Sequence, residues 1–326
     1  MATVLNASDQ LTFAEMAKRL DDQGNVRKVA EVMNETNEIS IDMPFTPASD
    51  GDIDLSTFAE VKEEGETVHA GEGVASSAHT TQRTTNYTAL VKRYAQVSND
   101  VLDKAVNRQM VLQKESNLTL KGMGLLQARL MVHGDFGKNS TEFNGFSTRR
   151  NALGDQCFSM GGSGSALTSI YLCALGDGYT KGIYPKTSKS AGMEIKHWSD
   201  VDIITGTRDG KELHDMGDKT MYKQQYGLSV EDPYSLIRLC NINPASVDSD
   251  ALVKKIFSLM KMLSKGAPTY ALYANRDILD ILDWASVNRV QVTRTAEDPW
   301  GRAVQMMREC RIRQVDQITT TESAIA

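Results

Sequence analysis

The 326-residue chain is predicted to be an α+β protein with mostly antiparallel strands. Three observations lead to this prediction. Amphipathic helical segments occur near the N-terminus and again after residue 248. Short apolar runs bounded by Gly-Asp turn signals fill the region between residues 167 and 242. A long segment rich in Thr, Gly and Glu, residues 44–88, separates the N-terminal helices from the rest of the chain.

The first 43 residues are expected to form two short helices. Thr12 and Glu15 fit a capping box, in which each side chain satisfies a free backbone N–H group at the start of a helix. A second amphipathic segment places Val26, Val29 and Met33 on one face. Helices with such narrow apolar faces are marginally stable alone, so we expect both to dock on another surface.

Residues 44–88 are expected to be extended. Structureless segments longer than about 12–15 residues are uncommon inside compact domains, and this one has too few large apolar residues to bury a core. The stretch 82–97 is rich in Thr, Tyr and Val and is expected to be a strand. Because a two-stranded excursion is only marginally stable, we expect it to pack against another copy of the chain.

A long helix is expected to follow, capped by Asn99 or Asp100 and ending near Val132. Its apolar stripe is expected to comprise Leu102, Ala105, Val106, Met110 and Gln113, resumed by Leu120, Leu126 and Leu130. Gly122 and Gly124 are expected to weaken or bend the helix near its end. A coiled coil is the competing interpretation, but the heptad pattern is not sustained.

The remainder of the chain is expected to form an α+β body. Turn signals at 176–178 and 208–210 predict two hairpins, and Asp248 is expected to cap an amphipathic helix that stops before Gly266 and Pro268. The expected strands are 167–175, 179–184, 201–205, 211–213, 222–230, 234–242, 269–274 and 311–318, with a further helix at 276–285.

Charge is distributed unevenly along the chain, whose formal net charge is −6. Residues 1–75 hold 16 Asp or Glu and 5 Lys or Arg, whereas the remainder holds 26 acidic and 31 basic residues. Regions of opposite sign favour head-to-tail contacts between copies, with an acidic arm on a basic neighbour. A solvated acidic region is the alternative interpretation.

Composition excludes several functional classes. The four cysteines are too widely spaced for a zinc or redox motif, and Cys173 and Cys240 lie in apolar runs and are expected to be buried, which suits a reducing compartment. The five histidines show no metal-binding spacing. The N-terminus lacks the features of a secretion signal, and no run of about 18 apolar residues predicts a membrane span.

No catalytic residue, cofactor site or metal site is predicted, and the chain is not expected to be an enzyme. Residues 50–54 resemble the start of a calcium loop, but Leu55 and Val61 occupy the positions that require Gly and Glu. Glu63, Glu64 and Glu66 could pair as glycosidase acids, although a solvated loop is the better interpretation. Six C-terminal arginines could contact nucleic acid, but we favour ion pairs with acidic groups: Arg289, Arg294, Arg302, Arg308, Arg311 and Arg313.

Several stretches, taken in order, resemble the major capsid proteins of tailed phages, which have the Hong Kong 97-like fold. The stretches are LTFAEMAKRLD at 11–21, EVMNETNEI at 31–39, SIYLCALGDGYTKGIYPKTSKSAG at 169–192, YGLSVEDPYSLIRLCNI at 226–242 and YANRDILDIL at 273–282. The resemblance extends over nearly the whole chain.

The resemblance implies a domain organisation and sites of motion. It implies an N-terminal arm (1–43), an extended E-loop (44–97), a spine helix with the start of a peripheral domain (98–149), an approximate axial domain (150–265) and remaining axial and peripheral strands with the C-terminus (266–326). Lys62 is the single lysine of the E-loop up to Thr88, so a covalent crosslink between subunits is not expected. We expect residues 43–49 and 122–124 to flex between subunit positions.

The resemblance also implies a function. The chain would assemble into pentamers and hexamers that form an icosahedral shell around double-stranded phage DNA, as part of a virion assembled in the bacterial host cytoplasm. Its implied partners are further copies of itself, possible scaffolding, portal and decoration proteins, and packaged DNA through weak, non-specific contacts, with no membrane. Two alternatives stay open: an encapsulin-type nanocompartment shell, and an enzyme with a site formed by the oligomer.

Overall fold

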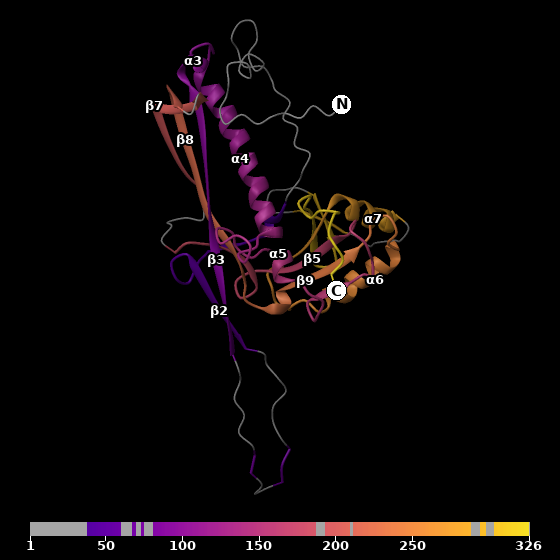
Figure 1. Cartoon of the computed structure of the whole chain (residues 1–326). Helices are drawn as coiled ribbons and strands as arrows, with labels where there is room; N and C mark the ends of the chain where they lie inside the picture. The colour runs from indigo at the N-terminus through magenta and orange to yellow at the C-terminus, as the bar shows by residue number, and fades with distance from the viewer. Residues whose placement is uncertain are drawn as a thin grey trace. The chain divides into compact units, whose positions relative to one another are not determined.

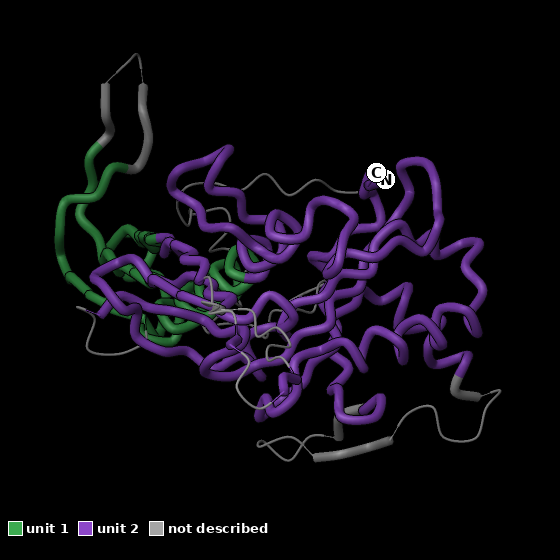
Figure 2. Tube along the Cα trace, turned by 90° about the horizontal axis from the view of Figure 1, so that it is seen from below, with its two compact units in different colours: residues 1–35, 90–127, 192–225 green, residues 36–89, 128–191, 226–326 purple. Residues whose placement is uncertain are grey.

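The computed structural model describes residues 38–59, 67–69, 73–74, 81–186, 193–208, 211–287, 294–297 and 303–325 (Figure 1). The helices expected within residues 1–37, with their capping residues Thr12 and Glu15, lie outside this range. The described residues divide into two compact units (Figure 2). Unit 1 contains 90–127 and 193–225, and unit 2 contains 38–89, 128–186 and 226–325. The predicted mixture of helices and mostly antiparallel strands is confirmed.

Unit 2 is built on a buried sheet. Strand β5 (Thr168–Leu175) pairs antiparallel with β9 (Leu236–Ile242) and β10 (Thr269–Ala274), and every residue of β5 and β9 is buried. Burial on both faces explains why these strands are almost continuously apolar in the sequence. The sheet continues from β10 to three strands near the C-terminus: β13 (Cys310–Gln314), β12 (Ala303–Met307) and β11 (Arg294–Glu297).

Two helices cover one face of this sheet. They are α6 (Ser249–Met260) and α7 (Arg276–Val287), which lie beside β5 and β9 (Figure 1). Asp248 caps α6 as predicted, since its carboxylate accepts a hydrogen bond from the N–H of Asp250. The apolar faces of both helices pack on alternate residues of the strands, which forms a large core cluster: Ile170, Leu172, Ala174, Ile237, Leu239, Leu252, Ile256, Leu272, Ile278 and Leu282.

The opposite face of the sheet carries an aromatic cluster. Phe146 belongs to the short helix α5 (Phe146–Arg149), and its ring lies 5.5 Å from that of Tyr171 and 5.9 Å from that of Tyr273. All three side chains are fully buried. Strand β4 (Cys157–Ser159) extends this region by pairing parallel with β9.

A hairpin extends from unit 2. Strand β2 (Ile53–Ala59) pairs antiparallel with the first part of β3 (Thr81–Ser98), from Ile53 opposite Tyr87 to Ala59 opposite Thr81. The strand expected at 82–97 is therefore confirmed. Preceding it, β1 (Phe45–Pro47) pairs parallel with β6 (Thr180–Tyr184), and β6 pairs antiparallel with the end of β8 (Lys211–Val230).

Unit 1 has a much smaller core. Its described residues comprise the second half of β3, helix α3 (Asn99–Leu102), residues 108–127 of α4 (Arg108–His133), and the long hairpin of β7 (Glu194–Arg208) with β8. The pairing of Arg208 with Lys211 confirms the hairpin expected there, with much longer strands than predicted, and residues 209 and 210 lie outside the described residues. One buried cluster consists of four aliphatic side chains: Val97, Val101, Leu102 and Val111. Ile203, Met221 and Tyr222 are also buried in this unit.

The single helix expected from Asn99 to Val132 is wrong, because the chain forms α3, turns, and starts α4 at Arg108. Asn107 restarts the helix, since its Oδ1 accepts a hydrogen bond from the N–H of Met110. The predicted apolar stripe also fails at Val106 and Met110, which are 70% and 45% exposed. Helix α4 runs without interruption through Gly122 and Gly124.

The hairpin expected around 176–178 is also wrong. Strands β5 and β6 share a single parallel bridge, Leu175 with Thr180. Because β9 and β10 occupy the two sides of β5, β6 pairs with β1 and β8 instead. Two strand limits differ as well. Residues 233–235 form a 3₁₀ turn ahead of β9, and the last strand ends at Gln314 rather than at residue 318.

Gly145 offers a direct test of the packing in unit 2. A Cβ atom at this position would lie 2.7 Å from the carbonyl oxygens of Leu130 and Met131, at the end of α4. Backbone atoms cannot move aside cheaply, so Gly145→Ala is expected to lower the free energy of unfolding by about 1–3 kcal/mol. Urea unfolding of the dissociated protein measures the change.

Gly154→Ala is the matched control, because a Cβ atom there meets nothing within 4 Å. Its expected effect is within about 0.5 kcal/mol. Equal stability of the two variants would contradict the tight contact at Gly145.

Candidate functional site

Residues 38–47 are fixed to the sheet of unit 2 by a buried ion-pair cluster. The carboxylate of Asp42, at the end of helix α2 (Ile39–Asp42), accepts hydrogen bonds from the guanidinium groups of Arg311 and Arg313. The side chains of Asp42 and Arg313 are 1% and 4% exposed. Glu38 adds a second carboxylate, 3.8 Å from Arg313. Buried charges require such pairing, so this cluster determines where the segment lies.

The sequence contains a signal for this cluster that the prediction did not use. Arg311 and Arg313 are two residues apart on a strand and therefore point to the same face. The expected preference for ion pairs is confirmed for these two arginines, and the partner is an acid of the same chain. Arg308 has no such ion pair among the described residues. Arg289 and Arg302 lie outside the described residues, as does the side chain of Arg294.

A buried polar network holds the base of the β2–β3 hairpin. Ser229 Oγ donates to Asp54 Oδ2 at 2.6 Å and accepts from Asn86 Nδ2 at 3.1 Å. Asn86 also donates to Ser56 Oγ and accepts from Arg149 Nη2 at 2.8 Å. Asp54, Asn86 and Ser229 are all buried. The hairpin is therefore oriented by directional hydrogen bonds as well as by apolar packing.

Arg149 is the unusual member of this network. Its guanidinium donates to Asn86 Oδ1 and to the carbonyl oxygens of Asn144 and Leu228, all of which are neutral. Burial, with the adjacent Arg150, lowers the pKa of Arg149 to about 10. No carboxylate pairs with it in the described part of the chain.

A cavity of about 930 Å³ lies beside this network. It is lined by residues 57–58, 82 and 84 of the hairpin, Arg149, Arg150, Asp155, Gln156, Gly178 and residues 230–234. Both signs of charge are present, and Glu231 is paired with Lys181 at 2.7 Å. The cavity therefore does not select an anion over a cation.

Exposed apolar side chains are concentrated on unit 1. They are Leu90, Tyr94, Val106, Met110, Leu118, Ile195, Trp198, Ile204 and Met216. On α4, only Val111 and Met123 are buried between residues 108 and 127. The hairpin and the segment beyond it expose Ile53, Val68 and Val74 in the same way. These exposed apolar side chains are candidates for a contact surface.

The remaining candidates from the sequence lie either in a turn or outside the described residues. At residues 50–54 the chain makes a tight turn, with reciprocal backbone hydrogen bonds between Asp50 and Ile53, and Asp54 points into the network instead. Lys62, Glu63, Glu64 and Glu66 lie outside the described residues. The described residues contain no group of three or more His, Cys, Asp or Glu side chains that could hold a metal ion.

All four cysteines are free and buried, which confirms the expectation for Cys173 and Cys240. Cys157 lies 3.8 Å from Cys240, sulfur to sulfur, and this hydrogen bond, with Arg238 nearby, lowers the pKa of Cys157 to about 7. Burial raises the pKa of Cys173. None of the helices among the described residues has the length and apolar character needed to cross a membrane.

The buried ion pairs of Asp42 can be tested by substitution. Asp42→Ala leaves the buried Arg313 without its main partner, which is expected to cost about 3–5 kcal/mol of unfolding free energy. Urea unfolding gives the magnitude. Limited proteolysis is expected to cut faster near residues 38–47, because that segment loses its anchor.

The control is Glu194→Ala, which removes two exposed ion pairs, to Lys196 and Lys223. Exposed pairs contribute about 0–1 kcal/mol, so its effect is expected to be small. If the two variants lost the same stability, the anchoring role of Asp42 would be refuted.

Comparison with protein families gives one match. Residues 21–326 match the family described as major capsid protein GP7. A comparison with curated proteins finds no match.

Three solved structures illustrate the comparison, and one of them shows the same fold. A chain in the near-atomic structure of bacteriophage Epsilon15 has a TM-score of 0.70 and 22% identity, and the alignment covers 100% of this chain and 99% of that chain. The capsid of bacteriophage JBD30 gives a TM-score of 0.49 at 10% identity, covering 88% and 92% of the two chains. The SrpI encapsulin from Synechococcus elongatus PCC 7942 gives 0.45 at 11%, covering 67% and 91%.

The Epsilon15 likeness confirms the predicted α+β capsid fold of the Hong Kong 97 type. The family match extends over all but the first twenty residues. The chain therefore belongs to the major capsid protein GP7 family, and it is a structural protein of the virion capsid rather than an enzyme.

Proposed function

We propose that this capsid protein assembles into pentamers and hexamers that close into an icosahedral shell around double-stranded DNA, in the cytoplasm of a bacterial host. The family match carries the proposal. It is supported by the hairpin and the apolar surface of unit 1, which a single chain leaves exposed. The same match favours a capsid over the encapsulin-type shell.

Roles for the chain's regions follow from this proposal. Residues 1–43 are the N-terminal arm and 44–97 the E-loop, both of which reach onto neighbouring copies. Residues 98–149 hold the spine helix and the start of the peripheral domain, 150–265 approximate the axial domain, and 266–326 return to the remaining strands. The β2–β3 hairpin lies in the proposed E-loop, and α4 lies in the proposed spine.

Burial of apolar surface drives the proposed association. Fully burying one large apolar side chain contributes about 1.5–3 kcal/mol. Part of this gain is offset by the loss of translational and rotational freedom and by ordering of side chains. Nine exposed side chains on unit 1 are enough for many modest contacts. A closed shell multiplies such contacts over all its copies, so no single contact needs to be strong.

Pentamers and hexamers place the same chain in different surroundings, which requires flexible positions. We propose Gly122–Gly124 as one hinge, because a Cβ atom at either glycine would have open space and the boundary between the two units follows at residue 127. Residues 43–49 are the second proposed hinge, although their strand β1 pairs with β6 in this structure.

The remaining proposed partners are a scaffolding protein, a portal protein and a decoration protein. We further propose that contact with packaged DNA is weak and non-specific, because the chain carries a net charge of −6 and an acidic shell does not retain incoming DNA strongly.

The proposed role of the hairpin can be tested by shortening it. Ala59 lies opposite Thr81, so a two-residue Asn-Gly turn can replace residues 60–80 without changing the strand register. The shortened protein is expected to unfold at the same urea concentration as the original in dissociated form, but to form no closed shells in electron cryomicroscopy. The original is expected to show closed polyhedral shells, or rings of five and six.

A variant with a Gly/Ser segment of equal length in place of residues 60–80 separates the contribution of the side chains from that of loop length. It is also expected to lose closed shells. Normal shells from the Asn-Gly variant would show that the hairpin tip takes no part in assembly.

A further inference from the structure

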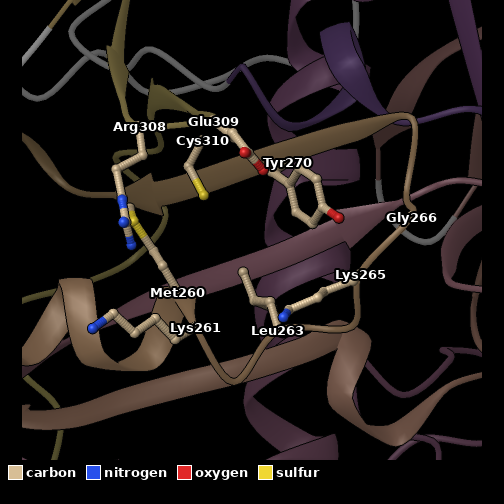
Figure 3. A pocket seen from close by; sticks show the side chains of 9 residues that line it. All are labelled: Met260, Lys261, Leu263, Lys265, Gly266, Tyr270, Arg308, Glu309 and Cys310. Carbon is tan, nitrogen blue, oxygen red and sulfur yellow. The ribbon is translucent and has the colours of Figure 1, made fainter.

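A cavity of about 520 Å³ lies between the C-terminal end of α6, the loop that follows it, and the turn between β12 and β13 (Figure 3). All of these elements belong to unit 2. Nine residues line it: Met260, Lys261, Leu263, Lys265, Gly266, Tyr270, Arg308, Glu309 and Cys310. Its volume lies within the range of about 300–1,000 Å³ that is typical of ligand sites.

Three cationic side chains line this cavity. Lys261 and Lys265 come from the loop after α6, and Arg308 comes from the β12–β13 turn (Figure 3). None of the three forms an ion pair with an acidic side chain in the described part of the chain. Glu309 is the one acidic residue of the lining, which leaves an excess of two positive charges. Lys261 follows the C-terminal end of α6, where the helix dipole favours a positive charge.

The backbone of Arg308 is a second, independent observation. Met307 pairs with Cys310 across the hairpin, so Arg308 and Glu309 form a two-residue turn, and Arg308 has φ +57°. Glycine or asparagine is the usual residue in this left-handed region, since other side chains are strained there. A strained residue at such a position indicates a role for its side chain. Here the guanidinium lies 5.8 Å from the ring centroid of Phe257.

The rest of the lining distinguishes between possible anions. A guanidinium binds phosphate through two parallel hydrogen bonds, and lysines add point charges. Tyr270, Met260 and Leu263 add an aromatic ring and apolar surface beside these charges. Cations next to an aromatic surface are the combination that proteins use for nucleic-acid strands. An acidic peptide would instead need hydrogen-bond partners for its backbone groups. The hydroxyl of Tyr270 already donates to Ser264 O and accepts from Ala267 N, so it is not available for this.

We propose that this cavity binds phosphate groups of a nucleic-acid backbone. The proposal deepens the proposed function, because it rests on a shell that encloses DNA, and it assigns the weak DNA contact to a defined place on the chain.

The test is fluorescence anisotropy with labelled 12-nucleotide DNA, single-stranded and duplex, titrated with the full-length protein at several salt concentrations. The combined variant Lys261→Gln, Lys265→Gln and Arg308→Gln is expected to bind at least about tenfold more weakly. The slope of log K against log salt is expected to become shallower by about 0.9 for each duplex phosphate that the variant no longer neutralises. The control is Lys92→Gln, Lys138→Gln and Lys254→Gln, which removes three exposed charges outside the cavity.

Arg308→Gly separates binding from a structural role. It removes the strain and the charge together, so the thermal midpoint is expected to stay equal or rise while DNA binding weakens. A lower midpoint with unchanged DNA binding would mean that Arg308 serves only the fold, and would overturn the proposal.

Two competitors identify the ligand. Inorganic phosphate and a peptide of residues 60–72, which carries five glutamates and one lysine, are titrated against bound DNA. Weak competition by phosphate and none by the peptide is expected. Equal DNA binding by the cavity variant and its control would overturn the proposal, and so would a cavity that binds the peptide or phosphate but no DNA. Imaging shells of the same variants separates the cavity proposal from the proposed shell function. Normal shells with unchanged DNA binding would refute the cavity proposal alone.

Discussion

The outer part of the β2–β3 hairpin, beyond the buried network at its base, is exposed in the single chain and needs another surface to cover it. Strands β2 and β3 are paired over seven residues, and Ile53 is still exposed. The part of β3 that pairs with β2 lies at the edge of the sheet, and a two-stranded segment is only marginally stable by itself. Unit 1 has a related shortage, because nine large apolar side chains remain exposed among its described residues. In a member of a capsid family, other copies of the chain are the natural source of the missing layer.

Unit 2 supplies the rigidity that such an arrangement requires. Its central strands are buried on both faces, with helices α6 and α7 on one side and the Phe146 cluster on the other. The segments that leave this platform are held at their bases by buried polar groups. Asp42 holds residues 38–47 through two arginines, and the network around Asn86 holds the hairpin. Directional contacts of this kind set an orientation that apolar packing alone leaves less defined.

Sequence patterns identified the elements whose signals are local. The apolar runs at β5 and β9, the cap at Asp248 and the hairpin of β7 with β8 each depend on neighbouring residues, and all three were predicted. The helix from Asn99 was predicted too long because a second cap, at Asn107, was not recognised. The hairpin at 176–178 failed for a different reason, since the pairing of β6 with β8 depends on strands distant in sequence. The same limit applies to the candidate sites, because only the folded chain brings Lys261 and Arg308 to one cavity.

Hydrogen exchange of dissociated and assembled protein tests most directly whether neighbouring copies complete this fold. The amides of Ile53–Ala59 and of residues 81–87 are the probes, and β5, which is buried within the chain, is the internal reference. The hairpin amides are expected to exchange rapidly in the dissociated protein and slowly in shells, while β5 stays protected in both. Equal protection of the hairpin in both states would mean that the single chain already stabilises it, and would contradict the account.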